Sequence, residues 1–368
     1  MATAADTKTK SKTKSPAKNE PARSAPAAHG AEILPSVRVD SYNLELSDGD
    51  GFLGDRASKG AFRALIEQWR KPLRALGDDP FGDEPSDKLG KKSLDELMAE
   101  GHPEAAGVVQ GAVEEFAHTL ADVVKRFLAQ KAWRDTERLV IGGGLRESRV
   151  GELAIGRAAV LLKAEKVAID IAMIRHAPDD AGLIGAAHLA PAWIFHGHDA
   201  ILAVDIGGTN IRAGVVRPRL DKASDLARAD VWKIELWRHA DDRPSREEAV
   251  EGLIAMLRKL ISRAEKGGLR LAPFIGIGCP GRIAPDGSIE RGAQNLPGNW
   301  ESSRFHLPAA IVAEIPKIGA YETTIVMHND AVVQGLSQVP FTTEVERWGV
   351  FTIGTGLGNA RFTNRAAE

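Results

Sequence analysis

Ile-Leu-Ala-Val-Asp-Ile-Gly-Gly-Thr-Asn-Ile-Arg, residues 201–212, is the stretch on which the interpretation of this chain depends. Its apolar run carries Asp205 near its end, breaks at Gly207 and Gly208, and resumes at Ile211. Apolar segments on either side of a short glycine-containing break predict two strands joined by a tight turn. The first local prediction is therefore a β-hairpin over this stretch.

The turn of this hairpin has a composition that suits a phosphate. Gly207 and Gly208 bring no side-chain bulk, so backbone amides stay exposed, and Thr209 and Asn210 add small polar side chains. Asp205 could hold Mg²⁺ through water, because that ion prefers few carboxylates together with substrate phosphates. If the two glycines are considered alone, an ordinary Gly-Gly hairpin remains the alternative.

Length and composition limit the class of protein. With 368 residues the chain has room for roughly two domains, and its 43% hydrophobic and 27% charged content is typical of a globular protein. A net charge of -2 gives no case for a nucleic-acid or membrane partner. The only cysteine, Cys279, rules out an internal disulfide and a multi-cysteine zinc site, and it favours a cytoplasmic location.

Residues 1–30 differ from the rest of the chain. Lysines alternate with Thr, Ser, Ala and Pro, and no large aliphatic residue lies between Met1 and Ile33. Such a segment cannot bury an apolar face, so we expect a disordered basic tail that lacks the apolar core of a secretory signal.

Downstream, strand-like and helix-like patterns alternate, which predicts an α/β fold. Apolar residues recur at helical spacing over 57–76, where Pro72 should end or bend the helix, and over 108–130. Two pairs, Ser93 with Glu96 and Ser245 with Glu248, predict capping boxes.

Taken together, the glycine turns and their neighbours resemble the sugar kinases of the actin/hexokinase superfamily, in particular the ROK (repressor, open reading frame, kinase) family. The hairpin at 205–212 resembles the first phosphate hairpin of that family. The matching pieces that follow it are Gly278-Cys-Pro-Gly281, Asn295-Leu-Pro-Gly-Asn-Trp300, Asn329-Asp330 and the second phosphate hairpin Gly354-Thr-Gly356.

The remaining family pieces lie upstream, so their order is rotated. Ala31-Glu-Ile-Leu34, residues 51–60, Ile141-Gly-Gly-Gly144 and residues 180–186 match segments that the family has after the second hairpin. The resemblance therefore implies a two-lobed actin-like, ribonuclease H-like ATPase fold in circularly permuted order. Residues 199–345 would form the first, phosphate and sugar-side lobe, and 31–198 with 346–368 the second, adenosine-side lobe.

Asp330 is the candidate general base for phosphoryl transfer, which needs positioning, charge neutralisation and a proton acceptor. It follows an expected strand and precedes an expected helix, so a helix-capping role is the alternative. The neighbouring Asn329 and the family resemblance favour the catalytic role.

The resemblance also implies the binding residues. Asn295, Asn329 and Glu32 would contact the sugar, and Asp205 would hold Mg²⁺ through water. ATP would lie against glycines and small polar residues of three turns: Gly207, Gly208, Thr209 and Asn210; Gly354, Thr355 and Gly356; and Gly142, Gly143 and Gly144.

Two departures concern the sugar side. Many family members carry a zinc site of one His and three Cys, but Phe52 and Leu53 occupy the corresponding stretch, so we expect no zinc site. The family histidine three residues after Glu32 is Pro35, and a second sugar-contacting glutamate is replaced by Gly54 or Asp55.

The leading hypothesis is an ATP-dependent hexose kinase, glucokinase-like and compatible with a homodimer. A related enzyme would accept an N-acetylated hexosamine or mannose, or use polyphosphate as donor. The third reading is a non-catalytic sugar- or nucleotide-sensing protein. Residues 1–35 lack the helical periodicity of the helix-turn-helix found in ROK repressors, which argues against DNA-directed sensing.

Overall fold

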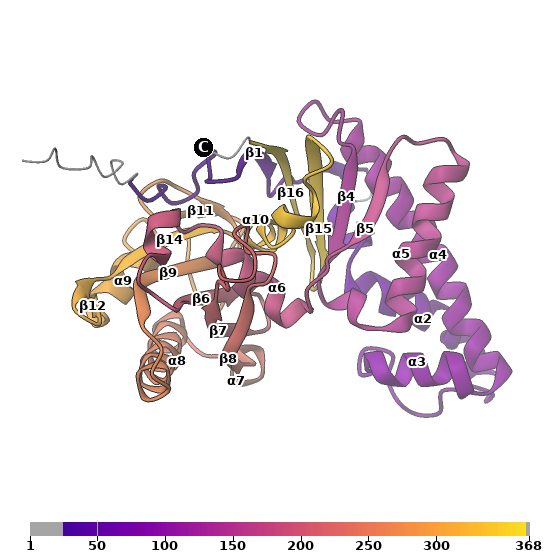
Figure 1. The fold of residues 1–368 in the computed structure, drawn as a ribbon. Helices are drawn as coiled ribbons and strands as arrows, with labels where there is room; N and C mark the ends of the chain where they lie inside the picture. Colours follow the sequence, from indigo (N-terminus) through magenta and orange to yellow (C-terminus); the bar gives the residue numbers. More distant parts are fainter. Residues whose placement is uncertain (1–24, 50, 366–368) are drawn as a thin grey trace, which may run out of the picture.

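The computed structural model describes residues 25–49 and 51–365, and it places two five-stranded sheets side by side (Figure 1). Most of the expected tail, up to residue 24, lies outside the described residues. Helices cover the outer sides of both sheets, and two further helices lie between the sheets (Figure 1).

The first sheet has the strand order β14-β9-β6-β7-β8. Strands β6, β9 and β14 run parallel, whereas β7 and β8 follow β6 as an antiparallel meander. The predicted hairpin is β6–β7, with Ile206 opposite Ile211 at its turn. The bounds of these strands are β6 Ala200–Ile206, β7 Ile211–Arg217, β8 Asp230–Trp237, β9 Leu271–Cys279 and β14 Thr324–Asn329.

The second sheet repeats this arrangement with the order β1-β16-β15-β4-β5. Here β15, β4 and β5 are parallel, and β15, β16 and β1 form the antiparallel part. The bounds are β1 Val37–Tyr42, β4 Arg138–Gly142, β5 Asp170–Met173, β15 Arg347–Ile353 and β16 Leu357–Asn364. The molecule thus has the two-lobed actin-like α/β fold, in which one sheet plan occurs twice.

The chain passes through the two sheets in different orders. In the first sheet the meander comes first, and β9 and β14 follow it. In the second sheet the strand at the far end of the meander, β1, comes first in the chain, and the other two meander strands come last. The end of the described chain therefore lies against a segment near its beginning, since Asn364 pairs with Val37 and the Arg365 amide donates to the Ser36 carbonyl at 3.0 Å.

Residues 190–200 connect the second lobe to β6 through the short helix η2 (Ala192–Phe195). Within this crossing Ile194 and Phe195 are buried. The crossing therefore contributes to the core as well as joining the lobes.

The outer helices follow the apolar patterns of the sequence. The first lobe carries α8 (Arg246–Lys266) and α9 (Leu307–Glu314). The second carries α2 (Lys59–Ala75), α3 (Lys91–Glu100), α4 (Pro103–Leu128) and α5 (Arg149–Ala164). Each set of helices buries its apolar face in a separate core cluster with its own sheet.

Two glycine-containing helices, α6 (Pro178–Ala187) and α10 (Asp330–Leu336), lie between the sheets (Figure 1). Residues of both belong to a third buried cluster that also includes Val350 and Phe362 of the second sheet. Helix α6 belongs by sequence order to the second lobe. It nevertheless packs on the first sheet, where a Cβ at Gly276 would lie 2.5 Å from the Ala186 carbonyl oxygen.

Local predictions about helix ends had mixed outcomes. The Ser245–Glu248 capping box is present at the start of α8. The box predicted from Ser93 is absent, because α3 begins two residues earlier and Gly90 occupies its N-cap. Helix α2 continues through Pro72 and ends three residues later, at Ala75, so the proline lies in its last turn.

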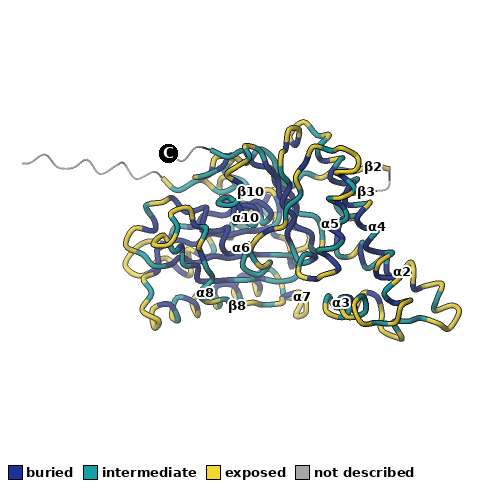
Figure 2. Tube along the Cα trace, turned by 45° about the vertical axis from the view of Figure 1, so that its right-hand side comes forward, coloured by how far each residue is buried: buried dark blue, intermediate teal, exposed yellow. Residues whose placement is uncertain are grey.

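The remaining elements are short. They are β2 Ser47–Asp48, β3 Gly51–Phe52, β10 Arg282–Ile283, β11 Ile289–Arg291, β12 Lys317–Ile318, β13 Tyr321–Glu322, α1 Leu53–Arg56, α7 His239–Asp242, η1 Gly144–Glu147 and η3 Val339–Phe341. Figure 2 shows the buried segments gathered in the central strands and interior helices. None of the helices described is both long and apolar enough to cross a membrane.

Candidate active site

The site begins at one edge of the first sheet, where its three parallel strands end. Asp205 on β6 pairs with Gly278 on β9, and Cys279 pairs with Asn329 at the end of β14. Carboxyl ends of parallel strands share one edge of a sheet, which is where ligands of α/β proteins commonly bind. Asp205 and Asp330 are therefore neighbours in space although 125 positions separate them in the sequence.

Asp330 is the first residue of α10 but does not cap it. Asn329 is the N-cap, since its Oδ1 accepts hydrogen bonds from the amides of Ala331 at 3.0 Å and Val332 at 3.3 Å. The Asp330 carboxylate accepts one further bond from the Ala331 amide, at 2.9 Å. Hydrogen bonds from its own backbone amide and from the Asn329 side chain also act on this carboxylate.

The surroundings of Asp330 make its carboxylate an unusually good proton acceptor. Burial, and then the negative charge of Asp205, raise the pKa of Asp330 to about 7. A general base is most effective when its pKa is close to the working pH. The capping alternative considered from the sequence is answered by Asn329, which does the capping itself.

Asp205 lies deeper than Asp330. Its side chain is 4% exposed, and Arg212 lies 3.3 Å from it while also binding Asp179 at 2.7 Å. Burial raises the pKa of Asp205, and the charge of Arg212 opposes that rise. A Cβ at Gly182 of α6 would lie 2.6 Å from the Asp205 Cγ, so the close approach of α6 also fixes this carboxylate.

The side chains available as ligands limit which metal ion the protein could bind without a substrate. Among the described residues no group of three or more His, Cys, Asp or Glu side chains is arranged to bind a metal ion. Asp205 and Asp330 supply carboxylates at one edge, which fits a Mg²⁺ ion held mainly by phosphates of a bound substrate.

The two predicted phosphate hairpins face one another. The Oγ1 atoms of Thr209 and Thr355, one from each lobe, are 3.4 Å apart. In the turns the amides of Gly207 and Gly354 donate across their own hairpins. Within the described part of the chain, the other turn amides donate no hydrogen bond: Gly208, Thr209, Asn210, Thr355 and Gly356. Free amides converging from two turns can bind phosphate oxygens.

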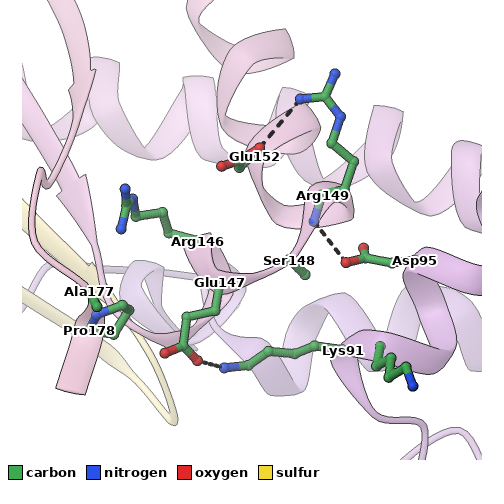
Figure 3. A pocket seen from close by; sticks show the side chains of 10 residues that line it. Lys91, Asp95, Arg146, Glu147, Ser148, Arg149, Glu152, Ala177 and Pro178 are labelled. Atoms are coloured by element: carbon green, nitrogen blue, oxygen red, sulfur yellow. Dashed lines mark hydrogen bonds and ion pairs between the residues drawn. The ribbon is translucent and has the colours of Figure 1, made fainter.

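The triple-glycine turn adjoins the second hairpin. Gly143 has φ +85, and a Cβ there would meet the Ile353 backbone at 2.5 Å, so both its conformation and its packing require glycine. A pocket of about 730 Å³ opens beside the turn (Figure 3). Its lining is mostly charged, and Figure 3 shows Lys91 paired with Glu147 and Arg149 paired with Glu152.

The residues expected to contact a sugar lie at the margin of this site. Asn295 is exposed, and its Cβ would be 2.9 Å from a Cβ placed at Gly208, so its loop touches the first hairpin. Glu32 is exposed and follows Ala31, whose carbonyl accepts a hydrogen bond from His328 Nε2 at 3.1 Å. The Asn329 amide is 2% exposed and donates to the Gly281 carbonyl at 3.0 Å, so structural bonds already occupy much of it.

Sequence reasoning did not assign several residues that the fold brings here. The His239 ring is buried and donates from Nε2 to the Gly207 carbonyl at 2.8 Å, which supports the first hairpin from below. Lys59 begins α2 beside the second hairpin. No local pattern marks either residue, since tertiary packing brings each of them to the site. Arg212, which pairs with Asp205, lies within the stretch 201–212 but had no assigned role.

Comparison with known proteins gave matches among solved structures only; no protein-family model and no curated protein sequence matches. A Cytophaga hutchinsonii protein described as a sugar kinase matches with a TM-score of 0.34 and 20% identity, covering 45% of this chain and 48% of its own. A Listeria monocytogenes protein described as an N-acetylmannosamine kinase matches with a TM-score of 0.32 and 22% identity, covering 45% of this chain and 47% of its own. A ROK hexokinase from Thermus thermophilus matches with a TM-score of 0.29 and 20% identity, covering 44% of this chain and 45% of its own.

These structures are of the kind that the sequence resemblance named. The aligned part of this chain spans about half the length of each of the three. The duplicated strand order, rather than these partial alignments, identifies the fold, and the chemistry must be argued from the site.

Proposed function

We propose that this protein catalyses ATP-dependent phosphorylation of a hexose hydroxyl, with Asp330 as the general base. The observation that supports this most directly is the position of Asp330 at a strand edge, where burial and the charge of Asp205 raise its pKa to about 7. A carboxylate of this kind is suited to accept a proton from an alcohol.

In the proposed reaction a sugar hydroxyl oxygen bonds to the terminal phosphorus of ATP while the bond from that phosphorus to the bridging oxygen breaks. The hydroxyl proton moves to the Asp330 carboxylate, and ADP leaves. The chain contributes by positioning and by charge: the free amides of the hairpins at 207–210 and 354–356 bind phosphate oxygens, and Arg212 keeps Asp205 in place. Mg²⁺, held through water by Asp205, would supply charge neutralisation at the phosphates.

Residues at the margin of the site would position the sugar that accepts the phosphoryl group. Sugar hydroxyls would be bound by Asn295, Asn329 and Glu32. The glycines at 142–144 would let adenosine approach the backbone. Asn295 next to Gly208 puts this sugar-side loop against the phosphate-binding turn, which a direct transfer between two substrates requires.

The test is ADP release from MgATP across a panel of hexoses and N-acetylhexosamines, comparing the wild type with Asp330→Asn. We expect turnover on one sugar, reduced in the variant by about a thousandfold or more, because the amide cannot accept the proton. Asp122→Asn, a substitution at a half-exposed position of α4, should retain wild-type turnover.

Unchanged turnover in Asp330→Asn would contradict the assignment of the base. If neither protein turns over any sugar while nucleotide or hexose still binds, the protein is a sensor rather than a kinase.

A further inference from the structure

Lys59 is the first residue of α2, and its backbone connects that helix to the second hairpin. The Lys59 amide donates to the Gly354 carbonyl at 2.9 Å, and Ser58 caps the helix by accepting from the Ala61 amide at 3.1 Å. Helix α2 has 17 residues, so the positive end of a long helix faces the turn at 354–356.

The Lys59 side chain lies among other cations. Burial, followed by the charges of Arg63, Lys91 and Arg238, lowers the pKa of Lys59, and Glu147 opposes this only weakly as the last contribution. Glu147 is itself paired with Lys91. Within the described residues Lys59 forms no ion pair and no side-chain hydrogen bond. A half-buried ammonium group surrounded by like charge is unfavourable unless an anion is bound beside it.

These cations belong to both lobes. Lys59, Arg63 and Lys91 come from α2 and α3 of the second lobe, whereas Arg238 follows β8 of the first. Arg238 is fixed near the first hairpin, because Ala240, two residues on, donates from its amide to the Thr209 carbonyl at 3.2 Å. Lys59 thus lies beside the second hairpin and Arg238 beside the first. The Nε of Arg238 pairs with Asp241 at 2.9 Å, and its terminal guanidinium nitrogens remain as donors for an anion.

We infer that Lys59 and Arg238 bind the phosphate chain of the donor substrate from opposite lobes, so that one polyanion joins the two hairpins. This inference rests on the proposed function for the identity of the donor but not for the existence of the site. Residues 51–60 resemble a zinc- and sugar-binding stretch of the ROK family, yet the structure brings Lys59 to the phosphate side.

Inorganic tripolyphosphate is the probe, because it carries the phosphate chain without a nucleoside. Its binding is measured by calorimetry to the full chain and to Lys59→Gln, Lys59→Arg and Arg238→Gln. We expect each glutamine variant to bind about tenfold more weakly, as loss of a charge-assisted contact predicts, and Lys59→Arg to stay within a few fold of wild type. Adenosine binding should be unchanged in all of them.

Lys71→Gln is the matched control, since it removes the same charge from the exposed side of the same helix, three turns away. Circular dichroism verifies that each variant is folded. Wild-type affinity in Lys59→Gln, an equal loss in Lys71→Gln, or no tripolyphosphate binding by the wild type would each overturn the inference. Tripolyphosphate binding that depends on Lys59, without turnover of any sugar, would instead support the site and reject the kinase.

Discussion

At the scale of single residues, two carboxylates with different partners share one sheet edge. Asp205 is ion-paired with Arg212, whereas Asp330 accepts hydrogen bonds at the start of α10 and faces the charge of Asp205. The environment therefore keeps one carboxylate in a fixed ion pair and leaves the other to exchange a proton near neutral pH.

The first prediction at this scale concerns stability. The pKa of Asp330 is raised in the folded state from 3.8 to about 7, so folding favours its protonated form. The stability that this provides is complete below about pH 4 and is lost as pH rises through 7. The free energy of unfolding of Asp330→Asn relative to wild type should therefore increase by about 2 to 4 kcal/mol between pH 4.5 and pH 8.5.

Urea unfolding at several pH values measures this difference. Parallel curves for wild type and Asp330→Asn would mean that the Asp330 carboxyl has an ordinary pKa.

The sequence could identify Asp330 but not its chemistry. An aspartate between a strand and a helix is compatible with capping, and the choice depends on whether its neighbour takes the cap, as Asn329 does. Burial and the charge of Asp205 come from strand pairing across the sheet, which local pattern does not reveal. Lys59 and His239 were missed for the same reason.

At the scale of elements, the helices between the sheets depend on glycine for close contact. A Cβ at Gly185 of α6 would lie 1.7 Å from the Val333 carbonyl oxygen of α10. A Cβ at Gly335 of α10 would lie 2.7 Å from the Phe362 ring of the second sheet. Small residues therefore set the spacing between the lobes and, through α10, the position of Asp330.

We predict that Gly185→Ala lowers the free energy of unfolding by about 3 kcal/mol, because the new methyl group meets backbone that cannot easily move. Gly156→Ala, in the middle of α5 with no atom near its Cβ position, should instead stabilise by about 0.5 to 1 kcal/mol. Equilibrium unfolding in urea compares the two. Equal effects of both substitutions would show that the α6–α10 contact is not tight.

Element types were largely predictable, and their ends less so. Apolar spacing gave α4, α8 and the β6–β7 hairpin, because each buries a regular face. The Ser93 box is absent although its residues satisfy the pattern, since Gly90 takes the N-cap of α3 three residues earlier. The Ser93 signal therefore did not decide where this helix begins, although serine is the better N-cap residue.

At the scale of the whole molecule, the second sheet is assembled from both ends of the chain. Strand β1 completes a meander whose other strands, β15 and β16, are the last in the sequence. The rotated motif order in the sequence matches this assembly, and the repeated sheet plan explains it: a chain that began at β6 would pass through both sheets in the same order. We propose that circular permutation of an ancestral chain produced the present order.

The corresponding prediction is that a rearranged chain, which begins just before β6, still folds. Asn364 pairs with Val37 and Arg365 bonds Ser36, so we would join residue 365 to residue 25 by flexible Gly- and Ser-rich linkers of increasing length. New ends would open between Gly197 and His198, where Gly197 is exposed and has φ +80. Loop tips of this kind accept new termini because few contacts are broken there.

The rearranged chain should fold with the far-ultraviolet circular dichroism of the original, and it should retain any sugar-dependent ADP release within about tenfold, since every residue at the sheet edge keeps its neighbours. The contrasting control opens the joined chain between Phe351 and Thr352, inside a buried strand paired on both sides, and should not fold. If both rearranged chains fail, the present order is needed for folding itself, and the meeting of the two ends is not the trace of a former connection.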